Sequence, residues 1–296
     1  MVVGPPDLAG READGLTLEL IEATEVIGMH DDAAQGVRRK KDSTLVRAAE
    51  AVRDGRASAM ISAGNTGATM AAALLRMGRI SGVKRPAVAT PIPVPGANPT
   101  ILLDAGANAE VQAEWLVQFA LMGSVYARSR FGIESPRVGL LSIGEEPGKG
   151  DTLRKETYEL LGAASHLNFV GNVEGRDIMS DAIDVCVTDG FTGNVVLKTL
   201  EGGMRSVIRA LLDAFDSEEQ YRPHAEALMP ALVPLYTSLS PDTYGGAVLL
   251  GVDGVCVIAH GSSSAEAIAN GIDVARDMVE HDMVGEIRTA IAANID

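Results

Sequence analysis

The amino-acid sequence predicts an α/β fold in which a mostly parallel sheet is covered by helices on both faces. Five apolar runs are each followed by a glycine-bearing turn and then by an amphipathic stretch, which is the pattern of strands that alternate with helices. Runs such as ILL (101–103) and VCV (185–187) are apolar throughout, as in strands buried on both faces. We therefore expect a three-layer sandwich with right-handed crossovers, formed as a single domain by residues 1–296.

The five units follow one another along the chain. The strands are expected at residues 58–62, 100–104, 137–143, 184–189 and 254–260. The helices are expected at about residues 69–78, 111–130 and 152–161, then after 194 as far as 215, and after 267 as far as 279. Because the turns that follow parallel strands line one edge of a sheet, we expect these five turns to meet in one ligand-binding crevice.

Residues 211–246 break this alternation. They read as two helical pieces around a polar turn, and the second piece combines large apolar residues with Pro230 and Pro234. We predict that they form a helical hairpin that projects from the core.

Composition and charge exclude several classes of protein. The formal charge of −15 would repel nucleic acid, whose binding needs positive charge. Cys186 and Cys256 lie in apolar runs, so we expect free, buried thiols. No apolar run reaches roughly 18 residues, so we expect no membrane-spanning helix, and the first residues lack the charged and apolar regions of a signal peptide.

The glycine-bearing turns are candidate anion sites. A turn that leads into a helix offers free N–H groups and the positive end of the helix dipole. Three of the turns carry asparagine, at Asn65, Asn108 and Asn194. Packing alone explains glycine in any single turn, but five such turns together favour a ligand with several negative charges. Neither G-x-G-x-x-G nor a P-loop is present, so we expect no dinucleotide, no ATP and no other cofactor.

Several basic side chains could bind or activate such a ligand. Lys198 follows Asn194 by four residues, so both face one side of a helix and the lysine could hold a phosphate; a solvated lysine fits the spacing equally well. Arg85 and Lys149 are alternative anchors. His260 lies where a strand meets GSSS and could donate a proton or orient a phosphate, or it could be a structural histidine. No two histidines have metal-ligand spacing, so we expect no metal.

Seven motifs occur together in one order: RRKKDSTL, SAGNTGA, LLDAGAN, GLLSIGEEPGKG, NFVGNVEGRDI, DVCVTDGFTGNVVLKTLEG and AHGSSS. With them, the chain from about Val26 to its last residue resembles the bacterial phosphate acyltransferase family, the acyl carrier protein:phosphate acyltransferases of phospholipid synthesis. The resemblance implies a Rossmann-like fold similar to those of phosphate acetyltransferases and isocitrate-type dehydrogenases. It also implies a cytoplasmic homodimer that associates peripherally with the inner face of the cell membrane.

The activity that the resemblance implies is transfer of a long-chain fatty acyl group from acyl carrier protein to inorganic phosphate. A membrane acyltransferase would then use the acyl phosphate to acylate glycerol 3-phosphate. No G-x-S-x-G elbow is present and Cys186 lies within a strand, so we expect phosphate to attack the thioester directly. The alternatives are a short-chain acyltransferase acting on acyl-CoA, a non-catalytic acyl- or carrier-binding protein, and a dehydrogenase of related fold.

The expected site draws on several of the motifs. We expect Lys198, Asn194 and His260 to be catalytic, with His260 protonating the leaving thiolate. The expected phosphate and substrate ligands are Gly64, Asn65, Thr66, Gly67, Asn108, Gly190, Thr192, Gly193 and Arg85. The acidic carrier protein is expected to dock on Arg205, Arg209 and Arg222, or on RRKK (38–41). The apolar face of the hairpin is expected to touch lipid or guide an acyl chain, with dimer or core packing as the alternatives.

The sequence departs from the family pattern at one place. The family opens with a strand and an Asp-x-Met-Gly-Gly-Asp turn, neither of which is present here, and VVGPPD (2–7) looks like the family's second strand region. We therefore expect a central strand and a loop of the site to be absent, and the chain to fold poorly or turn over slowly.

Overall fold

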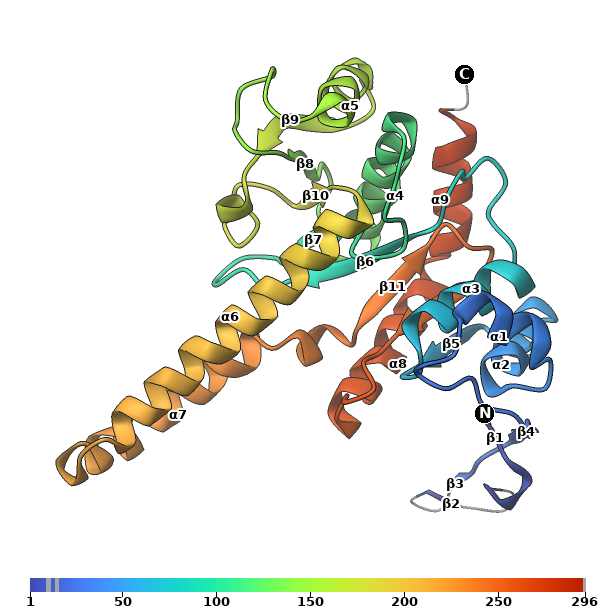
Figure 1. The fold of residues 1–296 in the computed structure, drawn as a ribbon, viewed down its shortest axis with the longest axis horizontal. Coiled ribbons are helices and arrows are strands. Elements are labelled where there is room, and N and C mark those ends of the chain that lie inside the picture. Colours follow the sequence, from blue (N-terminus) through green and yellow to red (C-terminus); the bar gives the residue numbers. More distant parts are fainter. Residues whose placement is uncertain (9–11, 14–15, 295–296) are drawn as a thin grey trace.

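The computed structural model describes residues 1–294 except 9–11 and 14–15, and it is built around an eight-stranded sheet (Figure 1). The strand order is β5-β12-β11-β6-β7-β10-β8-β9. The strands are β5 (Ala59–Ser62), β6 (Ala87–Ile92), β7 (Thr100–Leu103), β8 (Arg137–Leu141), β9 (Asn168–Val173), β10 (Val185–Val187), β11 (Ala247–Leu250) and β12 (Val255–Ile258). The five predicted strands are all present, and β6, β9 and β11 are additional.

Four of the seven strand pairings are parallel, which agrees with the predicted mostly parallel sheet. Strands β7, β10, β8 and β9 form one parallel block, and β5 and β12 form another. The two blocks are joined through β6 and β11, which pair with each other and with their outer neighbours in the antiparallel sense. Three successive reversals between β7 and β12 leave the two blocks pointing in opposite directions.

This reversal separates the glycine-bearing turns, so the prediction that all five meet in one crevice is wrong. Strands β7, β8 and β10 end at one edge of the sheet, which we call the Asp104 edge and which carries residues 104–108, 142–150 and 188–193. Strands β5 and β12 end at the opposite edge, which we call the His260 edge and which carries residues 62–67 and 259–264.

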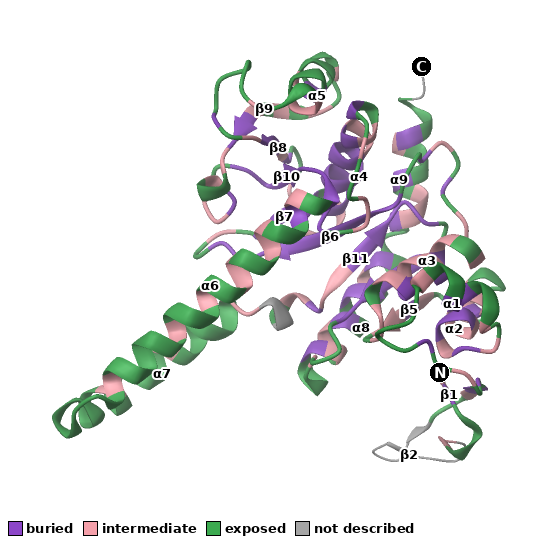
Figure 2. Cartoon of the chain, viewed as in Figure 1, coloured by how far each residue is buried: buried purple, intermediate pink, exposed green. Residues whose placement is uncertain are grey.

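Helices cover both faces of the sheet and form the predicted three layers. One core contains side chains of α4, α5, α8 and α9, and the other contains side chains of α1, α2 and α3, with α6 packed against it. Burial is concentrated in the sheet and in α4 (Figure 2). The helices that pack on the sheet are α1 (Ala33–Arg39), α2 (Thr44–Arg53), α3 (Thr66–Arg76), α4 (Ala113–Phe131), α5 (Thr152–Ala163), α8 (Ala265–Glu280) and α9 (Met283–Ala292).

The predicted hairpin is present and projects away from the sheet (Figure 1). Its arms are α6 (Gly190–Asp216) and α7 (Arg222–Ser238). The first arm begins at Gly190 rather than near residue 211, because α6 continues without interruption through Gly202 and Gly203. Beyond Gly193 neither arm has a buried residue, and Figure 2 shows the hairpin exposed along its length.

The segment that contains VVGPPD lies outside the main sheet. Its strand β1 (Val2–Gly4) pairs in parallel with β4 (Leu20–Glu22) in a separate two-stranded sheet. Between them, β2 (Glu12–Ala13) and β3 (Leu16–Thr17) form a small antiparallel pair. The short 3-10 helices of the chain are η1 (Pro6–Leu8), η2 (Gly175–Asp177), η3 (Glu219–Tyr221) and η4 (Pro241–Tyr244).

Both cysteines are free and buried, as predicted. Burial raises the pKa of the Cys186 and Cys256 thiols to about 12, so neither is a thiolate near neutral pH. Within the described residues, no helix is both long and apolar enough to cross a bilayer.

Candidate functional site

At the Asp104 edge, a buried carboxylate organises the turn that follows β7. Asp104 Oδ1 accepts hydrogen bonds from the backbone N–H groups of Val88, Gly106 and Ala107 at 2.9–3.0 Å. Its Oδ2 accepts from the backbone and side-chain nitrogens of Asn108 at 2.7 and 2.8 Å. Burial raises the pKa of Asp104, and these hydrogen bonds oppose that shift by favouring the ionised form. The carboxylate thereby ties the end of β7 to the start of β6.

The glycines at this edge allow α6 to lie directly against the Asp104 turn. A Cβ atom on Gly193 would lie 1.9 Å from the Asp104 carbonyl oxygen, and one on Gly190 would lie 2.7 Å from the Asn108 backbone nitrogen. The Gly190 N–H donates to the Asn108 carbonyl at 2.7 Å. The Asn108 side chain also donates to the Pro86 carbonyl at 2.8 Å. Close packing thus accounts for Gly190, Gly193 and Asn108.

The beginning of α6 is occupied by side chains of the protein itself. Asp189 caps the helix by accepting from the Thr192 N–H and hydroxyl, both at 2.8 Å. Arg154 of α5 donates to the same carboxylate and, at 3.2 Å, to the hydroxyls of Thr188 and Thr192. Partial burial works to raise the pKa of Asp189, but these donors outweigh it and lower the pKa. A phosphate at this helix end would meet a carboxylate already in place.

Asn194 and Lys198 lie further along α6 and are exposed. A Cβ atom on Gly106 would lie 3.6 Å from the Asn194 Cβ, so Asn194 covers the Asp104 turn. Lys198 Nζ lies 2.8 Å from Glu201 Oε2, as an exposed ion pair. Lys198 lies eight residues beyond Gly190, which is about 12 Å along the helix axis.

At the His260 edge, two helices on opposite faces of the sheet follow the neighbouring strands β5 and β12. Helix α3 follows β5 and is capped by Asn65, whereas α8 follows β12 and is capped by Ser264. The two turns are joined because the Ala259 N–H donates to the Ser62 carbonyl at 2.9 Å. A Cβ atom on Gly261 would lie 3.5 Å from the Ala63 carbonyl oxygen. The positive ends of two helix dipoles therefore lie at the same edge of the sheet.

The α3 side of this edge combines a fixed asparagine with hydroxyl groups. Asn65 Oδ1 accepts from the Ala68 N–H at 3.0 Å, and its amide nitrogen donates to the carbonyls of Gly28 and Met29 at 3.1 and 3.2 Å. The Ser62 hydroxyl accepts from the Gly64 N–H at 3.1 Å. Beyond the cap, Thr66 is exposed and Gly67 is half-buried. These contacts hold the turn rigid while leaving the first residue of the helix open to solvent.

The α8 side presents His260 to solvent. His260 Nδ1 lies 2.7 Å from the Ser262 hydroxyl and accepts from the Ser262 backbone N–H at 3.3 Å. Because Nδ1 is an acceptor in this turn, the neutral imidazole carries its proton on Nε2. The His260 backbone N–H donates to the Ser263 hydroxyl at 3.0 Å. The turn therefore orients an exposed imidazole with Nε2–H available as a donor.

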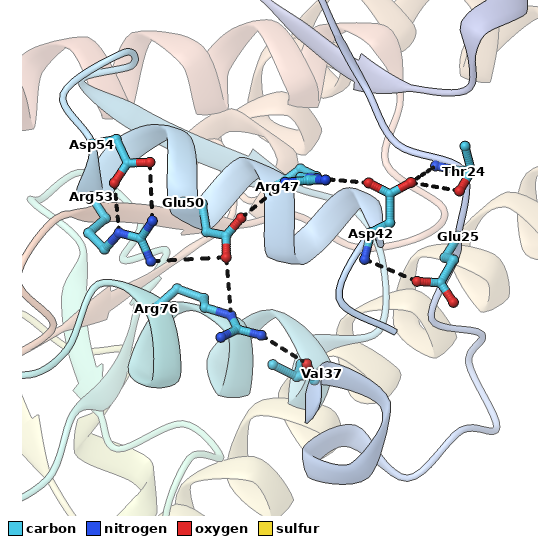
Figure 3. Close-up of polar contacts among 9 residues, drawn as sticks. All are labelled: Thr24, Glu25, Val37, Asp42, Arg47, Glu50, Arg53, Asp54 and Arg76. Carbon is cyan, nitrogen blue, oxygen red and sulfur yellow. Dashed lines mark hydrogen bonds and ion pairs between the residues drawn. The ribbon is translucent and has the colours of Figure 1, made fainter. Parts of the chain in front are cut away.

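A charged network fixes α3 relative to α1 and α2 (Figure 3). In the last turn of α3, Arg76 Nε lies 3.7 Å from Glu50 Oε1 of α2, and the guanidinium donates to the Val37 carbonyl of α1 at 3.3 Å. Arg47 lies 3.6 Å from the other oxygen of Glu50 and donates to Asp42 at 2.8 Å. Exposed ion pairs of this kind contribute about 0–1 kcal/mol each, so the network chiefly orients the helix that begins at the His260 edge.

The remaining predicted anchors lie elsewhere. Arg85 precedes β6 at the Asp104 edge, where its guanidinium lies 4.8 Å from the centre of the Trp115 ring. On the hairpin, Arg209 is 4.0 Å from Asp213 and Arg222 is 3.4 Å from Asp216, and Arg205 is exposed. In the RRKK segment, Lys40 is bound to Asp31 at 2.6 Å. The structure therefore brings together residues 62–67 with 259–264, and residues 104–108 with 188–194, but not these two groups with each other.

Sequence reasoning missed two kinds of residue. Arg154 and Asp189 form an ion pair at the Asp104 edge. The two residues are 35 positions apart, so no local pattern in the sequence indicates the pair. At the His260 edge, Ser62 positions the turn and Ser262 positions the imidazole. Both serines lie beside glycine-bearing turns, and this pattern in the sequence could have indicated their roles. Within the described residues, no cluster of three or more His, Cys, Asp or Glu side chains could hold a metal ion.

The sheet is covered by helices on both faces, so the protein is a three-layer α/β protein. In proteins of this class, anionic ligands commonly bind at the edges of the sheet where helices begin. The model of a family described as "Fatty acid synthesis protein" matches residues 6–285. The chain is 49% identical over 279 residues to a phosphate acyltransferase of Elusimicrobium minutum, which covers 94% of this chain and 80% of the relative. It is 44% identical over 274 residues to a phosphate acyltransferase of Bacillus subtilis, with 93% and 82% covered.

The protein therefore belongs to the bacterial phosphate acyltransferase family and is an acyltransferase. Solved structures with a similar fold include a branched-chain phosphotransacylase from Enterococcus faecalis, with a TM-score of 0.59 over 91% of this chain and 85% of that chain at 14% identity. A phosphotransacetylase from Streptococcus pyogenes gives a TM-score of 0.51 over 92% and 78% at 16% identity. These two likenesses confirm the predicted fold class.

Proposed function

We propose that the protein transfers a long-chain fatty acyl group from acyl carrier protein to inorganic phosphate, and that the reaction takes place at the His260 edge. The observation that carries this proposal is that two helices with neutral caps, α3 and α8, begin at the same edge of the sheet as an exposed imidazole. Such an arrangement favours a doubly charged anion through the helix dipoles and the free N–H groups of both first turns. The Asp104 edge carries similar turns, but its carboxylates oppose an anion.

The proposed reaction needs no covalent enzyme intermediate. A phosphate oxygen attacks the thioester carbonyl carbon, and the oxyanion that forms is stabilised by N–H and hydroxyl donors of the turn at residues 64–67. The C–S bond then breaks, giving acyl phosphate and a thiolate. The proton for that thiolate comes in net terms from the attacking hydrogen phosphate. His260, as the imidazolium, donates its Nε2 proton to the thiolate and regains a proton from the acyl hydrogen phosphate, so the products are acyl phosphate and free carrier protein.

The other predicted site residues fall into two groups: those that are exposed, and those whose polar groups already bind other parts of the protein. Lys198 remains in the proposal because its side chain is exposed on α6, whereas Asn194 is left out because it covers the Asp104 turn. Gly190, Thr192, Gly193 and Asn108 are assigned to packing and capping instead, because their polar groups already have partners within the protein. Arg85 is left out because it lies at the Asp104 edge.

The hairpin is proposed to serve the partners of the reaction. Its arms expose large apolar side chains, which suit a homodimer contact, the inner face of the cell membrane, or an acyl chain. The most exposed of these are Phe191, Val195, Val207, Leu228, Val233 and Tyr236. Within the described residues, Arg209 and Arg222 each form an ion pair and Arg205 forms none, so Arg205 is the arginine best able to meet an acidic carrier protein. Acyl phosphate released there would pass to a membrane glycerol-3-phosphate acyltransferase.

The test is an assay with three acyl donors. The protein is incubated with phosphate and either palmitoyl carrier protein, palmitoyl-CoA or acetyl-CoA, and acyl phosphate is trapped with hydroxylamine as the hydroxamate. The proposal expects the palmitoyl carrier protein to give the highest kcat/KM. A preference for acetyl-CoA would identify a short-chain enzyme, and hydroxamate from no donor would leave an acyl- or carrier-binding protein.

Carrier-protein docking has its own test. Arg205→Glu is expected to raise KM for palmitoyl carrier protein by about tenfold through charge repulsion, and to leave KM for palmitoyl-CoA unchanged. Arg128→Glu, a charge reversal at an exposed position outside the hairpin, is the control. Equal effects of the two variants would remove Arg205 from the docking surface.

A further inference from the structure

A recess of about 640 Å³ lies beside the first turn of α4, at the Asp104 edge of the sheet. One side of it is the loop between α3 and β6, and the other is the beginning of α4. Its volume is in the range of pockets that hold small organic ligands. The residues that line this feature, which we call the Arg85 recess, are Arg79, Lys84, Arg85, Gln112, Glu114 and Trp115.

The lining of the recess is positively charged, in contrast to the protein as a whole. The chain has 25 basic and 40 acidic residues, whereas the recess has the cations Arg79, Lys84 and Arg85 and the carboxylate of Glu114. The three cations are exposed, and within the described residues none of them forms an ion pair. A concave surface lined by charge of one sign attracts an ion of the opposite sign. The recess therefore favours an anion.

The contacts that hold the two arginines leave most of their N–H donors available. Arg79 Nη1 donates to the Lys84 carbonyl, which closes the loop. The Arg85 guanidinium lies over the Trp115 ring, 4.8 Å from its centre. This stacking uses the face of the guanidinium, so the N–H groups at its edge are free to bind an anion in the plane of the group.

The loop that carries these cations is fixed to α4. The Lys84 N–H donates to Gln118 Oε1 at 2.8 Å, and Gln118 Nε2 donates to the Gly82 carbonyl at 3.0 Å. Within the described residues, the Lys84 ammonium itself has no hydrogen-bond partner. The backbone is therefore held in place while the ammonium keeps its donors for a ligand.

We propose that the Arg85 recess binds the phosphate group of a small, free polyol phosphate. A phosphate monoester carries about two negative charges near neutral pH, and its oxygens match the forked donors of arginine. Three cations and one carboxylate leave two positive charges in the lining, which balance that dianion. A phosphate alone would fill only part of the recess. Gln112 and the Glu114 carboxylate can accept hydrogen bonds from the hydroxyl groups of the remaining part of the ligand.

Two other occupants fit the recess less well. A lipid surface needs apolar side chains to enter it, and Trp115 is the only large apolar residue of the lining. An acidic protein needs a broad interface, whereas these cations lie on one short loop.

The recess differs from the two sites described above. The carboxylates that oppose an anion elsewhere at this edge, those of Asp104 and Asp189, do not line it. None of its lining residues belongs to the turns of the His260 edge, so the inference goes beyond the proposed acyl transfer and does not depend on it.

The test uses the fluorescence of Trp115, which is the single tryptophan of the chain and therefore reports on the recess directly. The full chain is titrated with glycerol 3-phosphate, with inorganic phosphate and with glycerol. We expect glycerol 3-phosphate to change the emission with half-saturation at about 1 mM or below. Inorganic phosphate is expected to bind about tenfold more weakly, and glycerol is expected to have no effect. Potassium chloride at equal ionic strength is the control for screening.

A matched pair of variants locates the site. Lys84→Gln removes a charge from the recess without touching Trp115, and it is expected to raise the half-saturation concentration of glycerol 3-phosphate by about tenfold. Arg56→Gln removes a charge at an exposed residue outside the recess and is expected to leave binding unchanged. Arg85→Gln alters the surroundings of Trp115 itself, so its binding is measured by calorimetry, and we expect the heat of binding to be lost.

Several results would overturn the inference. They are an absence of response to glycerol 3-phosphate, or equal responses of the Lys84→Gln variant and the unmodified chain. Equal affinity for inorganic phosphate and glycerol 3-phosphate would assign the recess to the phosphate that accepts the acyl group. A response to phosphatidate vesicles but not to glycerol 3-phosphate would assign it to a lipid surface, and a response to acyl carrier protein alone would assign it to protein docking.

Discussion

The Asp104 edge and the His260 edge carry the same local pattern, a strand followed by a polar turn with glycine and a capped helix, but they use it differently. At the Asp104 edge, Asp104 accepts five hydrogen bonds and Asp189 is paired with Arg154. At the His260 edge the caps are neutral, and Thr66 and His260 face solvent. Whether a helix N-terminus can receive an anion thus depends on whether the protein has already placed a carboxylate there.

Removing the carboxylate at the first edge is expected to have the largest effect. Asp104→Ala leaves several buried N–H donors without an acceptor, so the free energy of unfolding should fall by about 4 kcal/mol or more. Urea denaturation followed by circular dichroism measures it. Asp54→Ala, at an exposed ion pair, is the control and should change stability by about 0.5 kcal/mol or less. A loss of about 1 kcal/mol or less for Asp104→Ala would mean that this edge is not held by its carboxylate.

Removing the imidazole at the second edge is expected to affect catalysis and not stability. His260→Ala should lower kcat about 100-fold, because the leaving thiolate loses its proton donor, while the urea midpoint stays unchanged. The hydroxamate assay under saturating donor gives kcat. His224→Ala, an exposed histidine of the hairpin, serves as the control. Full activity of His260→Ala would move the reaction away from the His260 edge.

Gly193 and Gly203 both lie in α6, but only Gly193 packs against another segment, so alanine at the two positions should change stability in opposite directions. Gly193→Ala should destabilise the protein by about 1–3 kcal/mol, because the new Cβ would collide with the Asp104 carbonyl. Gly203→Ala meets nothing within 4 Å and should stabilise it by about 0.5–1 kcal/mol. Thermal unfolding of both variants makes the measurement. The same sign for both would show that α6 does not depend on close contact with the Asp104 turn.

The smallest expected effect on catalysis belongs to Lys198, which lies on α6 beyond the Asp104 edge. Lys198→Ala should raise KM for phosphate or lower kcat by about tenfold, through loss of a positive charge near the anion. The exposed pair with Glu201 contributes little to stability, so folding should not change. Lys155→Ala, an exposed lysine of α5, is the control. Unchanged kinetics would confine the phosphate site to the turns of α3 and α8.

The sequence predicted the positions of the strands better than it predicted their relative directions in the sheet. All five predicted strands exist because their apolar runs are long and bounded by turn residues. Strand β6 was missed because its run contains Pro91, and β11 because it follows directly on Gly245 and Gly246. The antiparallel pairing of these two strands makes the two parallel blocks point in opposite directions. No local pattern in the sequence encodes this, since strand pairing joins residues far apart in the chain.

The same limit applies to the candidate site. Asn65 and His260 follow two strands that pair directly, so the turns that carry them lie at the same edge of the sheet. Asn108 and Gly190 looked equivalent to them in sequence. What distinguishes them is the contact that each makes with a distant segment, such as the hydrogen bond from Gly190 to Asn108.

Helix α6 is fixed at one end only. Its first turn meets the Asp104 turn at Gly190 and Gly193, and Val196, Leu197 and Leu200 pack partly against the core. The rest of the helix, which is about 40 Å long in total, has no buried residue. A tilt of a few degrees at this pivot would sweep the far tip through several ångströms. Gly202 and Gly203, midway along the rod, reduce its bending stiffness. A partner that binds the tip of the hairpin could therefore shift the turn at the base of α6.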